Sequence, residues 1–386
     1  MSIKIAEPLL KLRHENQERI GYMISILSQI WYQMQRDLFP HLARELSPLS
    51  GKENKLVWVL ELVRVEEYVP RRWWSRGRPW KERSLLARAF VAKMVYNLST
   101  TEELIERLGK DDNLRRLCGW EKVDKLPSES TFSRVFHSFA ESKLPQRVHA
   151  ELLKKYESER LVGHISRDST DIVAREKAVS KPKDEEEPEP KRKRGRPKKG
   201  EEKLRKEPSR LERQSGMRLC DILSELPKGC DFGFKKKNGR SYYWRGYKLH
   251  VDWADGEIPI SSILTSASMH DSQAAIPLAK MSSERVVNLY DLMDSAYDAK
   301  EIEEYSAALG HKPIIDCNPR RGKKFKMDPA EKRRYDERST AERGFSMLKE
   351  SFGGSKIRVR GYKKVMCHLM FGILALTAER LLNLLM

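Results

Sequence analysis

The sequence predicts an α/β protein with an all-α region in front of it and a charged linker within it. Up to residue 156 the apolar side chains recur with helical spacing, whereas from residue 161 short apolar segments alternate with amphipathic ones, as in a domain of strands and helices. After the first strand, a run of Lys, Glu and Pro is too polar to bury a core and is expected to be disordered. The predicted parts are a helical domain at 1–158, an α/β domain at 159–174 and 214–358, the linker at 175–213, and a covering helix at 359–386.

Charge and composition narrow the class of protein. The 386 residues include 75 Lys and Arg against 56 Asp and Glu, a formal net charge of +19 that favours polyanionic partners. The apolar stretch at 369–376 is too short to span a membrane, and the charged first 20 residues lack the apolar segment of a secretory signal. The five cysteines show no C-x-x-C pair and are expected to be reduced thiols. We therefore expect a cytoplasmic protein that associates with the nucleoid.

The helical region contains a pattern that is typical of a helix-turn-helix near residues 99–139. A capping box at 99–102 begins a short helix. In the following helix at 131–139, apolar residues at i, i+3, i+4 and i+7 leave Ser133 and Arg134 on a polar face. We expect this face to contact DNA. An ordinary helical bundle has the same spacing and stays open as the alternative.

The other elements follow from the same periodicities. Further helices are predicted at 20–38, 83–98, 272–281, 299–309 and 329–352. Strands are predicted at 161–173, 286–293 and 313–317, and a hairpin is predicted to pair 243–253 with 258–265.

The linker contains the sequence Arg-Gly-Arg-Pro at 194–197, within a basic run. Such a narrow, extended segment places its guanidinium groups in the narrow minor groove of A·T-rich DNA. The motif resembles an AT-hook, with Arg194 and Arg196 as its DNA contacts. A solvated basic segment without a binding role is the alternative. A second Arg-Gly-Arg-Pro at 76–79 precedes a periodic helix, so we interpret it as a turn at the helix entrance.

Four polar residues of the predicted helix at 329–352 share one of its faces. Tyr335, Arg338, Glu342 and Lys349 are spaced by 3, 4 and 7 residues, which places them within an arc of about 60° at 100° per residue. The pattern favours a single functional stripe. Glu342 also has the spacing of an ordinary ion pair with Arg338, which is the simpler interpretation.

Two acids in apolar strands strengthen the functional interpretation. Asp168 lies inside the first strand of the α/β domain, and Asp294 directly follows another. A buried carboxylate without a partner is costly, and a divalent cation would supply the partner. Together with Glu342 these acids could hold two Mg²⁺ ions about 4 Å apart, an arrangement that cuts phosphodiester bonds. Mn²⁺ is expected to substitute for Mg²⁺.

At these residues the sequence resembles the DDE transposases of bacterial insertion sequences, whose catalytic domain is RNase H-like. The family's Tyr-x2-Arg-x3-Glu-x6-Lys signature is met in full at 335–349, and its second-acid motif is met at 294–298. The first acid matches Asp168, although Ser169 stands where the family usually has Gly, and Asp171 is a rival for this place. The resemblance extends over residues 76–385, including the segments 246–250 and 270–272.

The resemblance implies a transposase that binds the ends of its element, cleaves there by water attack and transfers the freed 3′-hydroxyl to target DNA. The implied metal ligands are Asp168, Asp294 and Glu342, and the implied contacts to double-stranded DNA are Tyr335, Arg338 and Lys349. Self-association is implied as well, because two ends must be brought together. Two alternatives stay open: a regulator that binds A·T-rich DNA without catalysis, and an RNase H-like nuclease without strand transfer.

Overall fold

The computed structural model describes residues 49–70, 82–158, 160–179, 208–237, 239–318 and 327–385. Four sequence predictions lie wholly or mostly outside these residues: the helix at 20–38, the turn at 76–79, the disordered linker at 175–213, and the AT-hook with Arg194 and Arg196.

The N-terminal region is helical, as predicted. Its helices are α3 (Gly51–Val63), α4 (Arg83–Val95), α5 (Thr101–Lys110), α6 (Asp112–Cys118), α7 (Glu129–Glu141) and α8 (Leu144–Tyr156), with short 3₁₀ turns η2 (Val65–Tyr68) and η3 (Val123–Lys125). The capping box of α5 is formed by Thr100 and Glu103, one residue later than predicted. Helix α7 buries the predicted apolar stripe: its Phe136 ring lies 4.9 Å from that of Phe90 on α4.

The α/β region contains a six-stranded mixed sheet with the order β2-β3-β1-β5-β6, and β4 pairs with β3 beside this path. The strands are β1 (Leu161–Val173), β2 (Asp231–Lys237), β3 (Arg240–Ala254), β4 (Ile258–Ser266), β5 (Val287–Met293) and β6 (Lys312–Ile315). Strands β1, β5 and β6 run parallel, whereas the pairs β1–β3, β2–β3 and β3–β4 are antiparallel. This arrangement is consistent with an RNase H-like fold. The predicted strands are confirmed within a few residues, but β2 was not predicted.

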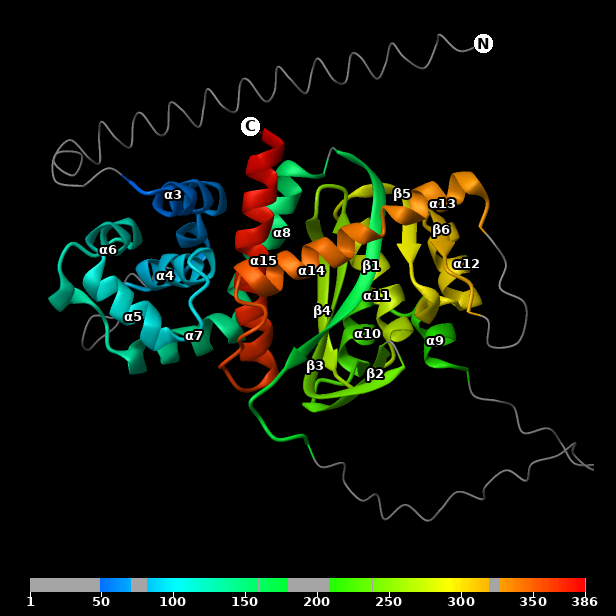
Figure 1. Ribbon diagram of the computed structural model, residues 1–386, viewed down its shortest axis with the longest axis horizontal. Coiled ribbons are helices and arrows are strands. Elements are labelled where there is room, and N and C mark those ends of the chain that lie inside the picture. The colour runs from blue at the N-terminus through cyan, green and yellow to red at the C-terminus, as the bar shows by residue number, and fades with distance from the viewer. Residues whose placement is uncertain are drawn as a thin grey trace, which may run out of the picture.

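Helices cover both faces of the sheet (Figure 1). They are α9 (Arg210–Gly216), α10 (Leu219–Glu225), α11 (Ala275–Ser283), α12 (Lys300–Ala308), α13 (Pro329–Asp336), α14 (Ser339–Ser351) and α15 (Tyr362–Leu385), with 3₁₀ turns η4 (Asp271–Ala274) and η5 (Ser295–Tyr297). Neighbouring residues of β3 define the two faces: Trp253 packs against Phe345 of α14, and Asp252 accepts a hydrogen bond from Ser282 of α11. The site is therefore framed by α14 on one face and α11 on the other.

Two predictions were wrong, one about the continuity of a helix and one about the end of the linker. The predicted helix at 329–352 is two helices, because Glu337 and Arg338 form a tight turn in which the Arg338 N–H donates to the Tyr335 carbonyl, 2.9 Å away. The predicted linker ends earlier than residue 213, because α9 begins at Arg210, after a capping box between Ser209 and Glu212.

Helix α15 lies between the N-terminal helices and the sheet (Figure 1). It packs against α3, α4, α7 and α8 on one side and β4 on the other, and its Phe371 ring lies 5.7 Å from that of Phe90. Its length and hydropathy match those of a membrane span, but 83% of its most apolar window is buried within the protein. One continuous apolar core therefore joins the helical region to the sheet.

Candidate active site

The guanidinium of Arg338 joins two of the three predicted acids. Its Nη1 lies 3.3 Å from Oδ2 of Asp168 on β1, and its Nη2 lies 2.8 Å from Oε1 of Glu342 on α14. The same group lies 5.9 Å from the centre of the Tyr335 ring. The structure thus brings Tyr335, Arg338, Asp168 and Glu342 together, although through the turn between α13 and α14 rather than along one continuous helix.

Asp168 and Asp294 are neighbours because of strand register. Strands β1 and β5 are parallel, with Arg167 opposite Met293, so each acid comes one residue after this pair. Asp294 accepts a hydrogen bond from the backbone N–H of Ala296, 2.9 Å away, and thereby begins η5. Asp168 accepts one from the N–H of Ser169, 2.7 Å away. Both carboxylates are thus held by backbone amides, one and two residues later in the sequence.

Burial and like charge destabilise the ionised form of both acids. Burial, together with the charges of Asp294 and Asp271, raises the pKa of Asp168 to about 7, although the Ser169 N–H and Arg338 oppose this shift. Burial and the charge of Asp271 raise the pKa of Asp294 as well. The local negative charge therefore exceeds what Arg338 balances, and such an excess favours a bound cation.

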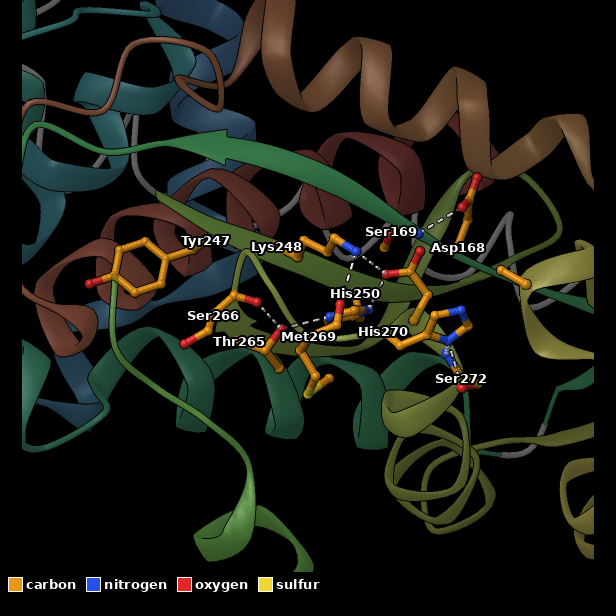
Figure 2. Close-up of polar contacts among 12 residues, drawn as sticks. Asp168, Ser169, Tyr247, Lys248, His250, Thr265, Ser266, Met269, His270 and Ser272 are labelled. Carbon is orange, nitrogen blue, oxygen red and sulfur yellow. Dashed lines mark hydrogen bonds and ion pairs between the residues drawn. The ribbon is translucent and has the colours of Figure 1, made fainter. Parts of the chain in front are cut away.

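Sequence reasoning missed the part that Asp271 plays in this cluster. Its Oδ1 lies 3.0 Å from Nζ of Lys248 on β3, and its carboxylate accepts a hydrogen bond from the hydroxyl of Ser169 on β1. Burial alone would raise the pKa of Asp271, but His250, Lys248 and Ser169 together lower it. One sequence feature could have predicted this contact: Lys248 and His250 alternate on a strand, and Asp271 begins the next helical turn. Figure 2 shows Lys248, Ser169 and Asp168 together.

Two buried polar atoms lie beside the acids without a hydrogen-bond partner among the described residues. One is the hydroxyl of Tyr297, which is fully buried within the electrostatic reach of Asp168, Asp271 and Asp294. The other is Nδ1 of His250, whose Nε2 lies 2.8 Å from the hydroxyl of Thr265. Burial lowers the pKa of His250 to about 4, so this side chain is neutral at pH 7.

His270 caps η4. Its Nδ1 lies 2.8 Å from the hydroxyl of Ser272, and it also accepts a hydrogen bond from the N–H of Ser272 (Figure 2). This is the capping role that a histidine at a helix start commonly has.

Asp171, the rival for the first acid, has a different environment. Its Oδ1 lies 2.7 Å from Nζ of Lys235 and 3.4 Å from Nζ of Lys349. Burial would raise the pKa of Asp171, but these two lysines lower it. Lys349, the last residue of the predicted stripe, thus contacts Asp171 rather than the group around Arg338.

The donor set fits a divalent cation in its chemistry. Carboxylate oxygens are the ligands that Mg²⁺ prefers, and Asp168 and Asp294 place two of them where ionisation is disfavoured without a cation. Glu342 is 65% exposed and turned towards Arg338. No group of three or more acids, histidines or cysteines within the described part of the chain is close enough to enclose a metal ion. In this structure Glu342 is therefore paired with Arg338 and does not form a three-acid group with Asp168 and Asp294.

The other predicted DNA contacts lie in parts of the chain away from this site. Ser133 and Arg134 are exposed on α7, where the guanidinium of Arg134 lies 3.2 Å from the carbonyl of Ser130 on the same helix. Arg194 and Arg196 lie outside the described residues.

Two family models match the chain. One, described as "Transposase DDE domain", matches residues 163–378, which is more than half of the chain. The other, described as "Transposase domain (DUF772)", matches residues 44–138 and thus the N-terminal helices. No curated protein and no solved structure is significantly similar to the chain.

Proposed function

The chain belongs to the DDE transposases of insertion sequences, and from this premise we propose that it cleaves the ends of its element and joins the freed 3′-hydroxyl to target DNA with Asp168, Asp294 and Glu342 as metal ligands. One observation carries the assignment of residues: Asp168 and Asp294 lie at neighbouring positions of paired parallel strands, and both have raised pKa values. Two bound Mg²⁺ ions, or Mn²⁺ in their place, would activate the attacking oxygen and stabilise the leaving oxygen.

Arg338 would exchange its carboxylate partners for a DNA phosphate during the reaction. In the metal-free protein it balances part of the charge of Asp168 and Glu342. With this charge balanced by bound cations, the Arg338 guanidinium would be free to bind a phosphate, for which its forked geometry is well suited. Tyr335, whose ring is in contact with Arg338, and Lys349 would bind neighbouring phosphates.

Other parts of the chain bind DNA away from the chemistry. The N-terminal helical domain holds the element ends, with Ser133 and Arg134 on its exposed face, and the linker adds Arg194 and Arg196 in the minor groove of A·T-rich DNA. Two copies of the chain associate so that two ends are cut together. We place the protein in the cytoplasm, at the nucleoid.

The test is a cleavage and joining assay on DNA that carries the element ends, with Mg²⁺ or with EDTA. We expect Mg²⁺-dependent cutting and joined products from the wild type, and no cutting from Asp294→Ala or Glu342→Ala. Both variants should still bind the ends, as a gel-shift assay would report. Cutting that persists in both variants contradicts the assignment. Cutting without joined products favours a nuclease, and binding without cutting by the wild type favours a regulator.

A further inference from the structure

Strand β2 and the first part of β3 form a two-stranded ribbon that extends beyond the rest of the sheet (Figure 1). Strand β1 pairs with β3 from Gly246 onward, and β4 pairs with it from Tyr247 onward. Residues 240–245 of β3 pair with β2 and with no other described strand. A ribbon in this position has one face turned towards β1 and another turned away from the body of the sheet.

The inner face of the ribbon is fixed to the site. Lys235 forms an ion pair with Asp171 on β1, and its ammonium also lies 5.8 Å from the centre of the Trp244 ring. Trp244 is buried, covers Gly233, and donates a hydrogen bond to the carbonyl of Tyr247, 3.1 Å away. These contacts hold the ribbon in place beside β1, three residues along that strand from Asp168.

The outer face presents large aromatic side chains to solvent. Phe232, Phe234 and Tyr243 are 60%, 54% and 66% exposed, and the rings of Phe234 and Tyr243 lie 5.0 Å apart across the two strands. They share one face because Phe234 is opposite Tyr243, and Phe232 is two residues before Phe234. An exposed cluster of this kind marks a binding surface in a soluble domain.

Basic side chains surround these rings. Arg245 lies opposite Phe232, and Lys236 lies opposite Ser241, so both belong to the outer face. Neither forms an ion pair with a residue that the structure describes. Residues 231–246 contain five Lys and Arg and one Asp, a net charge of 5 − 1 = +4, together with five aromatic residues.

We propose that the outer face of the ribbon is a stacking platform for unpaired bases of a DNA strand. Bases expose their flat faces only when they are unpaired, and aromatic rings flanked by lysine and arginine are the usual means of binding them. A second copy of the chain fits this surface poorly, because two ribbons of charge +4 would repel each other. The proposal rests on the proposed function, in which a DNA end is cleaved at Asp168, and it adds that bases near this end become unpaired.

The test measures binding of a fluorescein-labelled 20-nucleotide oligothymidylate by fluorescence anisotropy, with full-length protein in EDTA. We expect the double variant Phe234→Ala, Tyr243→Ala to bind about 5- to 150-fold more weakly, the range reported for loss of one stacked base. The conservative variant Phe234→Tyr, Tyr243→Phe should retain wild-type affinity. A matched control is Leu161→Ala, Val287→Ala, which removes two exposed apolar side chains that face each other on β1 and β5.

A 20-base-pair duplex of unrelated sequence serves as the second probe, and the alanine variant should bind it as the wild type does. Unchanged affinity of the alanine variant for the oligothymidylate would overturn the proposal. So would an equal loss for both probes, or a loss of self-association in sedimentation, which would make a second copy the occupant. Binding is measured without metal, so its result does not depend on the cleavage assay. A failure of the binding prediction can therefore be told from a failure of the proposed function.

Discussion

Strand β1 carries an ion pair on each of its two faces, and these pairs differ in how completely they are satisfied. Arg167 and Asp252 are 1% and 0% exposed and are joined by two hydrogen bonds of 2.8 Å, and Ser282 donates a third bond to Asp252. Asp168 and Arg338 are 21% and 20% exposed and share one contact of 3.3 Å. Arg167 and Asp168 are adjacent in sequence, so strand alternation alone sends them to opposite faces.

The two pairs therefore differ in burial and in the number of contacts that hold them. The pair of Arg167 and Asp252 is fully buried and both carboxylate oxygens accept hydrogen bonds, and Ser282 links the pair to α11. The pair at Asp168 is incomplete: burial, together with the charge of Asp294, raises the pKa of Asp168 despite the contact with Arg338, so the site favours an additional cation.

The largest expected effect on stability comes from breaking the buried pair of Arg167 and Asp252. Arg167→Met leaves the carboxylate of Asp252 buried without its cation, which should lower the free energy of unfolding by about 3–5 kcal/mol. Unfolding in urea, followed by circular dichroism, measures this loss. Arg167→Met combined with Asp252→Leu should recover most of it. If the single variant loses less than about 1 kcal/mol, the pair is not the structural contact described above.

Mg²⁺ should stabilise the folded protein by binding beside Asp168. At a concentration of about 100 times its dissociation constant, Mg²⁺ is expected to raise the free energy of unfolding by about 2.7 kcal/mol. The gain should be larger at pH 8 than at pH 6, because the pKa of Asp168 is raised to about 7 and only the ionised acid binds the cation. Thermal unfolding with Mg²⁺ or EDTA measures it. An equal gain in Asp294→Asn would place the cation elsewhere.

Removing the charge of Asp168 should stabilise the metal-free protein. The pKa of this acid rises from 3.8 in the unfolded chain to about 7 on folding, so its contribution to stability is present below pH 4 and is lost as the pH rises through 7. At pH 8, Asp168→Asn should therefore be more stable than the wild type by about 1–2 kcal/mol, a figure discounted for the partial exposure of the side chain. A stability difference that does not change between pH 4 and pH 8 would refute this explanation.

The smallest effect is expected at Asp171. Asp171→Asn removes the partner of Lys235 and Lys349, both partly exposed, and should lower the free energy of unfolding by less than about 1 kcal/mol. Because the pKa of Asp171 is lowered, this contribution is present at neutral pH and disappears as the pH falls through the pKa. End cleavage should stay within several-fold of the wild type. If cleavage is abolished here and retained in Asp168→Asn, Asp171 is the first acid.

Local patterns predicted the elements whose side chains alternate between core and solvent or follow a buried stripe. Strand β1 at Leu161–Val173 has the predicted bounds, and α7 buries the predicted phenylalanines. Strand β2 was missed because its Phe232 and Phe234 are exposed, so that no apolar face pointed to the core. Local sequence patterns therefore predict best those elements whose structure depends on burial.

The turn at Glu337 and Arg338 escaped prediction for another reason. No Pro or Gly interrupts the sequence there. The turn is instead accompanied by contacts to β1, about 170 residues away in sequence: Ser166 donates to the carbonyl of Glu337, and Arg338 pairs with Asp168. Contacts between distant segments leave no local signal, and the same holds for the hydrogen bond between Ser169 and Asp271.

Helix α15 follows every other described element in the sequence, yet both the N-terminal helices and the sheet complete their cores against it. During synthesis, neither half has its final packing surface until the ribosome has made the segment Tyr362–Leu385. Contacts across some 300 residues, such as those between α3 and α15, also form slowly. A partly made chain without this segment therefore lacks the shared core of both halves.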